Sequence, residues 1–250
     1  MIIAHDNEWP AATLTESAQV SSLPAENTQV MPVRKPWRVS ATSGYIDADF
    51  GAAVSLQDFA MPWSNLTTAA THRIELSTVS AGANDVLDTG TVSAGVLAGY
   101  PEVYYSHASA LSAQYMRWTF TDATLTFLDI GYIFAGVGWR PTRGPAIGDA
   151  VRWADGSDIE ETIGGQLLTN TGPRFRVADF ELNGNSESEV MTNALELDRL
   201  QGITANVLVR LDPTNYPVAK TIFGPLVQAT PIIAATFASA RKRYSVRQRL

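Results

Sequence analysis

The chain has 250 residues, of which 45% are hydrophobic and 17% are charged, and its formal net charge is -7. This is enough apolar material for a sizeable core, and the length fits one large β domain or two modest domains. The negative charge argues against a general nucleic-acid coat, and the lack of cysteine excludes disulfides, thiolate metal sites and cysteine nucleophiles. The low charged fraction favours a surface that is partly covered by partners.

The first 36 residues carry four prolines, which predict an extended N-terminal arm over residues 1–36 that crosses the body of the protein. The opening stretch MIIAHDNEWP does not have the form of a secretory signal, because its apolar run stops at His5 and no basic segment precedes it. No stretch approaches the ~18 apolar residues that a spanning helix needs, so no membrane partner is expected.

From Trp37 onward, short strands alternate with turns. The stretch AQYMRWTF has the period of a half-buried strand, which predicts that Met116, Trp118 and Phe120 face the core. Arg117 then lies on the other face. Three roles are open for it: it forms a salt bridge within the sheet, it binds a ligand, or it is an ordinary charge that faces solvent. Several such strands with almost no helical periodicity predict a mainly β protein with an antiparallel β-sandwich or jelly roll over residues 37–142.

Composition changes at WRPTRGPAIGDA, which is rich in proline, glycine and arginine and predicts a linker. We expect a smaller β-rich assembly domain over residues 143–250, barrel-like and with one α-helix in SESEVMTNALELDRLQG. Ser186 and Glu189 predict a capping box at the start of this helix, and Gly202 predicts its end.

The chain ends in RKRYSVRQRL, which alternates like a strand. Its basic face would carry four arginines, namely Arg241, Arg243, Arg247 and Arg249. We interpret this face as a subunit-interface strand that pairs with acidic groups of a neighbouring subunit. A nucleic-acid or localisation patch is the alternative, but no specific nucleic-acid binding is expected because the rest of the chain is negative.

The sequence offers no catalytic constellation. The three histidines lack metal-ligand spacing, and no phosphate loop, dinucleotide fingerprint or nucleophile elbow occurs. Asp47 and Asp49 share one strand face, which is more typical of a solvated edge than of a glycosidase pair. The loop DGSDIEE offers oxygens for calcium but not the spacing of the helix-loop-helix site. We therefore predict a protein that is not an enzyme, with no catalytic, metal or cofactor-binding residue and no cofactor.

Aromatic residues in predicted loops are the candidates for ligand binding or an interface. They are Trp63 and Asn65 in PWSNLT, and Tyr100, Tyr104 and Tyr105 in YPEVYY. Aromatic rings on loops stack on sugars and also anchor protein interfaces, whereas core packing is the structural alternative.

Three stretches in order, YIDADFG, AQYMRWTF and FLDIGYIFAG, resemble strands of discoidin-like (galactose-binding-like) domains, from about Trp37 to Gly136. The resemblance implies a galactose-binding-like jelly roll, although Gln114 stands where an arginine is usual and Phe50 replaces the leucine of a turn. It places Arg117 at a position where these domains usually keep an arginine, which favours a framework role. Their sugar-binding loops have no residue-by-residue match here, so sugar binding is not implied.

Over almost its full length, the chain resembles tail-tip structural proteins of long-tailed bacteriophages, on stretches such as WSNLTTAATHRIELS and LELDRLQGITANVLVRLDP. In that family a galactose-binding-like jelly roll is joined to a smaller β-rich domain. The resemblance implies a virion protein of the distal tail or baseplate hub, assembled in the host cytoplasm. Its partners would be further copies in a ring and other tail proteins (tail tube, hub, tape measure), with a host-surface glycan as a candidate ligand.

The alternative hypothesis is a carbohydrate-binding adhesion module that recognises a cell-surface glycan. It is compatible with the first, because such a module could act within a tail. An enzyme such as a glycan hydrolase would need a carboxylate pair or a nucleophile, and the sequence shows neither.

Overall fold

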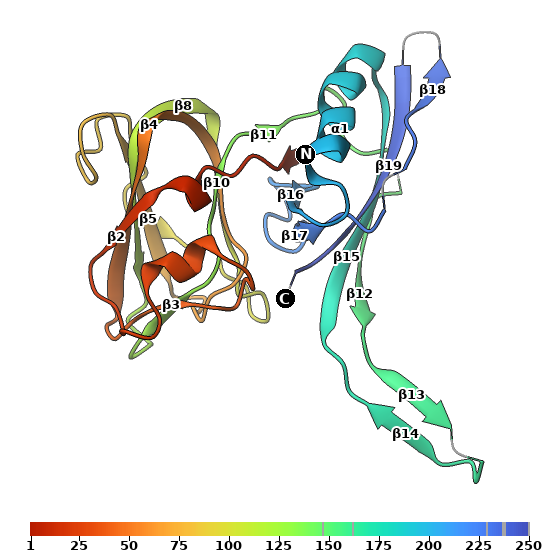
Figure 1. Ribbon diagram of the computed structural model, residues 1–250, viewed down its shortest axis with the longest axis horizontal. Helices are drawn as coiled ribbons and strands as arrows, with labels where there is room; N and C mark the ends of the chain where they lie inside the picture. The colour runs from red at the N-terminus through yellow and green to blue at the C-terminus, as the bar shows by residue number, and fades with distance from the viewer. Residues whose placement is uncertain (147, 162, 229, 237–238, 250) are drawn as a thin grey trace. The chain divides into compact units, whose positions relative to one another are not determined.

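The computed structural model describes all residues except 147, 162, 229, 237, 238 and 250. The chain forms two compact units, which are coloured by residue number in Figure 1. The jelly-roll unit comprises Ala4–Trp139 and Thr214–Ala219, and the α+β unit comprises Met1–Ile3, Arg140–Pro213 and Lys220–Leu250. No helix in the described part of the chain is long and apolar enough to span a membrane.

The jelly-roll unit is built almost wholly from strands. Its elements are η1 (Trp9–Ala11), β2 (Thr13–Glu16), η2 (Ala25–Gln29), β3 (Trp37–Val39), β4 (Ser43–Met61), β5 (Thr71–Ser77), β6 (Leu87–Asp88), β7 (Val92–Ser93), β8 (Val103–Thr121), β9 (Leu128–Ile130), β10 (Phe134–Gly136) and β11 (Gly138–Trp139), where η marks a 3-10 helix.

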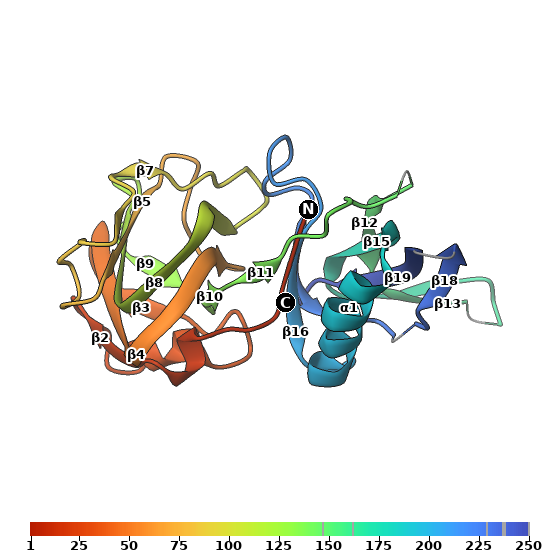
Figure 2. The ribbon, with the colours of Figure 1, turned by 90° about the horizontal axis from the view of Figure 1, so that it is seen from above.

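The two longest strands, β4 and β8, pair antiparallel and organise this unit (Figure 2). The register shifts between Asp49 and Val54, so that the first part of β4 lies between β2 and the end of β8, while the last part lies between β10 and the start of β8. Strand β5 pairs with the last part of β8, on the side away from β4. A bulge bends a strand and increases its twist, so one pair of strands can serve both layers of the jelly roll.

The alternation predicted for β8 is confirmed. Met116, Trp118 and Phe120 are completely buried in the core. The intervening side chains, including Arg117, lie on the outer face and are partly exposed. The Trp118 and Phe120 rings pack with their centres 5.0 Å apart.

Residues 4–36 differ from the separate extended arm predicted for residues 1–36, because they belong to the jelly-roll unit itself. Trp9 is completely buried, and its indole Nε1 donates a hydrogen bond to Thr28 Oγ1 at 3.0 Å. Asn7 fastens the segment to β10, because its Oδ1 accepts from the Ala135 amide at 2.8 Å. The prolines prevent a long helix or strand here, but they do not prevent Trp9, which precedes the first of them, from anchoring the segment in the core.

Arg117 has the framework role expected of it. Its Nε and Nη2 donate to the two carboxylate oxygens of Asp47 on β4, both at 2.7 Å. The guanidinium lies 4.1 Å from the centre of the Tyr45 ring. On another side Gly82 (φ +79°) lies so close that a Cβ there would be 2.7 Å from Nη1. The hydrogen bonds to Asp47 raise the pKa of Arg117, and this bidentate pair joins β4 to β8 on the outer face.

The described part of the α+β unit contains one helix and several strands. They are β1 (Ile2–Ala4, whose last residue belongs to the jelly-roll unit), β12 (Ala150–Asp155), β13 (Asp158–Glu161), β14 (Leu167–Asn170), β15 (Arg174–Ser186), α1 (Glu187–Gln201), β16 (Asn206–Arg210), β17 (Thr221–Pro225), β18 (Ile233–Thr236) and β19 (Ser239–Arg247).

The main sheet of this unit is antiparallel with the order β12-β15-β19-β18, and α1 covers one of its faces (Figure 1). The N-cap half of the predicted capping box is confirmed, since Ser186 Oγ accepts from the Glu189 amide at 3.2 Å, and Gly202 (φ +51°) ends the helix. The Glu189 carboxylate accepts from the Thr142 amide at 2.8 Å. Tyr244 of β19 lies under the helix, with its hydroxyl donating to the Ala194 carbonyl at 3.4 Å. The odd-numbered side chains of β19 therefore point away from α1.

Replacing Arg117 with alanine should lower the free energy of unfolding by about 1.5–3 kcal/mol, because it removes charge-assisted hydrogen bonds and leaves Asp47 without its partner. Urea titration followed by tryptophan fluorescence measures the loss. Arg34→Ala, at an exposed position of the same unit, is the matched control and should change little. Equal losses in the two variants would contradict a framework role for Arg117.

Candidate functional site

A groove of about 500 Å³ opens between two loops of the jelly-roll unit, at residues 66–68 and 96–101. Its surface is largely apolar, with the partly exposed ring of Tyr100 and the hydroxyls of Thr67 and Thr68 beside Leu66 and Val96. Such a combination of apolar surface and a few polar groups is typical of small-ligand sites.

Hydrogen bonds hold the two loops in place. The Ser64 hydroxyl donates to the Pro101 carbonyl at 3.1 Å, and the Ala94 amide donates to the Ala70 carbonyl at 2.9 Å. Buried Asp122 accepts from both the amide and the hydroxyl of Thr67 at 2.8 Å. Burial alone would raise the pKa of Asp122, but the hydrogen bonds from threonine lower it below its usual value. The groove is therefore formed before any ligand arrives.

Of the five residues predicted for a ligand or interface, Tyr100 is the one among the described lining residues of this groove. Asn65 lies in the adjoining loop, but its amide is engaged, since Oδ1 accepts from the Asp129 amide at 2.8 Å and Nδ2 donates to the Phe127 carbonyl at 3.0 Å. The half-buried Trp63 contributes its carbonyl to the Gly131 amide at 3.0 Å. Asn65 and Trp63 thus hold the loop against the start and end of β9.

The structure places Tyr104 and Tyr105 in β8 rather than in a loop. The Tyr105 ring packs 6.0 Å from both Phe59 and His72, centre to centre, and burial raises the pKa of its hydroxyl. Tyr104 is paired with Ala60 across the ladder. Because neighbouring side chains alternate in a strand, the two tyrosines lie on opposite faces, and neither is among the described lining residues of the groove beside Tyr100.

His72 is buried next to Tyr105 and is held in one protonation state. Its Nδ1 lies 3.0 Å from Trp118 Nε1, which can only donate, so Nδ1 must accept and the proton sits on Nε2. Burial lowers the pKa of His72 to about 4. Among the described residues, no group of three or more acids or histidines could hold a metal ion.

The basic face predicted at the C-terminus is present on β19. Arg241, Arg243 and Arg247 are exposed on the side of the sheet away from α1, and Arg249 follows the strand. The predicted acidic partner of a neighbouring subunit is partly replaced by one from the same chain, because Arg241 Nε lies 3.7 Å from Glu181 Oε1. The Arg247 guanidinium lies 3.8 Å from the centre of the Phe175 ring.

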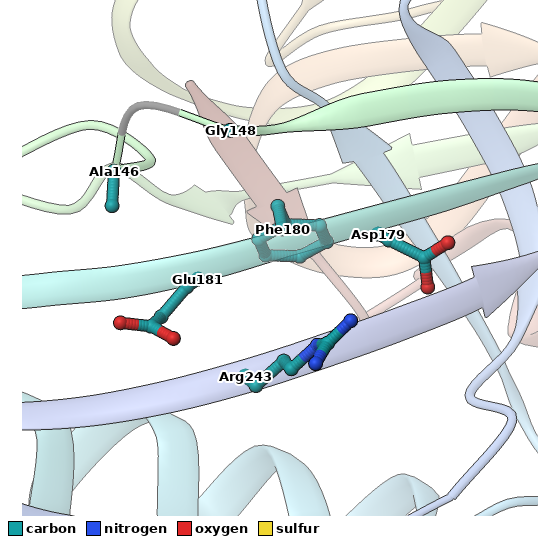
Figure 3. A pocket seen from close by; sticks show the side chains of 6 residues that line it. All are labelled: Ala146, Gly148, Asp179, Phe180, Glu181 and Arg243. Carbon is teal, nitrogen blue, oxygen red and sulfur yellow. The ribbon is translucent and has the colours of Figure 1, made fainter.

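Arg243 lies beside a smaller groove of about 170 Å³, with Asp179 and Glu181 from β15 (Figure 3). Asp179 is 3.5 Å from Arg152. Within the described part of the chain, the guanidinium of Arg243 makes no ion pair. The face of the sheet away from α1 therefore carries charges of both signs, and the arginines of β19 outnumber the acids.

The sequence reasoning missed an exposed β-hairpin formed by β13 and β14. The segment DGSDIEE, interpreted as a loop, ends in strand β13, which pairs with Leu167–Asn170. All eight paired residues are exposed, including Ile159 (62%), Leu167 (67%) and Leu168 (56%). The pair Gly164-Gly165 between two β-compatible runs was the signal that could have predicted the hairpin.

No protein-family model and no curated protein sequence matches the chain. Solved structures do match about half of the chain. A family 32 carbohydrate-binding module of AlyQ, in complex with 4,5-unsaturated mannuronic acid, is 21% identical, with a TM-score of 0.39, and the match covers 54% of this chain and 97% of that one. Chitosan-binding module 1 from a chitosanase/glucanase of Paenibacillus sp. IK-5 is 16% identical, with a TM-score of 0.41, and the match covers 52% of this chain and 98% of that one.

The family 32 module of NanJ from C. perfringens, in complex with galactose, is 14% identical, with a TM-score of 0.42, and the match covers 54% of this chain and 98% of that one. These three similar structures are carbohydrate-binding modules. The predicted fold class, mainly antiparallel β with a galactose-binding-like jelly roll and one helix in the remainder, is confirmed. The resemblance to tail-tip proteins has no counterpart in these three structures and stays a prediction.

The lowered pKa of His72 predicts a pH-dependent stability. Between pH 6.5 and about 4 the unfolded chain binds a proton at this residue and the folded chain does not, so the free energy of unfolding should fall by about 1.4 kcal/mol per pH unit as the pH decreases. Urea titrations from pH 7 to pH 4 measure this slope.

In these titrations His72→Gln should remove this part of the slope, whereas His107→Gln, outside the core, should keep it. Parallel profiles for the wild type and His72→Gln would show that His72 does not set the dependence.

Proposed function

We propose that this chain is a non-catalytic structural subunit of a larger assembly, namely a virion protein at the tip of a bacteriophage tail. The observation that carries this proposal is the β13–β14 hairpin, whose two strands expose apolar side chains in the α+β unit. The assembly would contain further copies of the chain and other tail proteins.

A two-stranded hairpin is at best marginally stable in water unless something packs against it. Burying an isoleucine or leucine side chain contributes roughly 1.5–3 kcal/mol, and Ile159, Leu167 and Leu168 all lie more than half exposed. A partner that covers them would therefore both stabilise the hairpin and gain affinity from it.

Other apolar side chains of the same unit support a protein with several contacts. The outer side of α1 exposes Met191 (43%) and Leu195 (51%), which are one turn apart, and β12 exposes Trp153 (54%). Monomeric proteins rarely expose large apolar patches, and where such patches occur they commonly mark interaction sites. The full-length sequence resemblance, with its jelly roll joined to a smaller β-rich domain, supports a tail tip as the assembly.

Immunogold electron microscopy of virions that carry this chain tests the proposal. An antibody against the chain should label the end of the tail distal to the head, because that is where tail-tip proteins assemble. Tailless heads from the same phage are the control and should stay unlabelled. Label on heads or along the tail tube, or no chain detected by mass spectrometry of the virions, would contradict the proposal.

Glycan binding by the jelly-roll unit is a second candidate function, and the groove beside Tyr100 favours it. An aromatic ring offers an apolar surface for the face of a sugar, and the hydroxyl of the exposed Thr68 can exchange hydrogen bonds with sugar hydroxyls. The groove lies on loops braced by the sheet, where binding residues are commonly found.

The full chain should therefore bind a cell-surface glycan on a broad glycan panel, and Tyr100→Ala should weaken this binding at least tenfold. That factor corresponds to about 1.4 kcal/mol, which is within the range for loss of one aromatic contact. Tyr216→Ala, at an exposed tyrosine of the same unit, is the matched control. No binding on the panel, or binding that both variants retain, would remove this candidate.

A further inference from the structure

We infer that the β13–β14 hairpin of one copy docks on the outer face of β19 in a second copy of this chain. The inference rests on the proposed function and names the partner and the two surfaces of the subunit contact. It follows from the charge of the hairpin, the charge of β19 and the spacing of the charged side chains.

The hairpin exposes acidic side chains together with apolar ones. Residues 158–170 contain three acids, Asp158, Glu160 and Glu161, and no lysine or arginine. Asp158 and Glu160 lie two residues apart on one face of β13, and Leu168 is directly opposite Glu160. This face presents two carboxylates and a leucine, and all three side chains are exposed.

The outer face of β19 has the opposite charge. The stretch from Ser239 to Arg249 contains no acid, and Arg241, Arg243 and Arg247 lie on the face away from α1. The acids beside them on β15 are held only loosely, since the Arg241–Glu181 and Arg152–Asp179 distances are 3.7 and 3.5 Å. By comparison, Arg117 lies 2.7 Å from Asp47.

Arg243 is the centre of this face. It lies beside the groove shown in Figure 3, with an exposed guanidinium that forms no ion pair within the described part of the chain. An arginine in this position can donate to an incoming carboxylate without first losing a strong partner.

The charged groups have the same spacing on both surfaces. Asp158 and Glu160 are two residues apart on β13, as Arg241 and Arg243 are on β19, and two residues of a strand span about 6.6 Å. Two ion pairs can therefore form side by side in one register. Leu168 would then lie against the aliphatic parts of the arginine side chains.

The contact must join two copies. The hairpin continues the direction of β12 and β15 away from α1 (Figure 1), and its strands are exposed in their own unit, so it does not cover the β19 face of its own copy. A hairpin on one copy and a β19 face on the next form a heterologous contact, which repeats into a ring or an open array.

Disulfide trapping of the full chain tests the contact, because the chain has no native cysteine to confuse the result. An equal mixture of the Glu160→Cys and Arg243→Cys variants should form a disulfide-linked dimer under mild oxidation, with at least fivefold more product than either variant alone. In the control mixture, Arg243→Cys is replaced by Thr192→Cys, an exposed position on α1, and little product should form.

Charge reversal supplies an independent measurement by sedimentation equilibrium. Arg243→Glu and Glu160→Arg should each weaken self-association by about tenfold or more, as expected for close charge pairs. A mixture of the two variants should associate more tightly than either alone, because the opposite charges meet again at one of the contacts.

Equal trapping at Arg243→Cys and Thr192→Cys, unchanged association after charge reversal, or a hairpin cysteine that traps a different tail protein would each overturn the inference. A chain that is monomeric in solution but labels the tail tip would also overturn it, while leaving the proposed function in place. A chain that is monomeric and absent from virions would contradict both the inference and the proposed function.

Discussion

The antiparallel pairing of β4 and β8 is the constraint on which the jelly-roll unit depends. Each strand has 19 residues, and the register shifts between them let one ladder serve both layers of the fold. Its inner face carries the ring of Trp118, and its outer face carries the Arg117–Asp47 pair. Because both features lie in one half of the ladder, core packing and an ion pair fix the same register.

A comparable pairing of β15 with β19 forms the base of the α+β unit. Lys242 and Tyr244 point toward α1, where the buried Lys242 ammonium donates to the Asp198 carboxylate and the Thr230 carbonyl. The opposite face of β19 is left for arginines. A strand that is anchored on one face and cationic on the other gives a rigid surface for an acidic partner, as a binding site requires.

Local patterns predicted much of this fold. The two-residue period identified the buried face of β8, and Ser186 with Glu189 marked the start of α1, because both signals depend only on neighbouring residues. The burial of Trp9 and the placement of Tyr105 in a strand depend on tertiary contacts, so the sequence did not reveal them. Of the predicted ligand residues, Tyr100 alone reaches the described groove, because hydrogen bonds within the framework occupy Asn65.

The central claim is that a partner covers the β13–β14 hairpin when the chain is assembled. Hydrogen–deuterium exchange of the backbone amides in residues 158–170, measured over a hundredfold range of protein concentration, tests it most directly. The account predicts fast exchange in dilute solution and strong protection at high concentration, while the β4–β8 ladder stays protected throughout. Hairpin exchange that is equally fast at every concentration and within purified virions would contradict the claim.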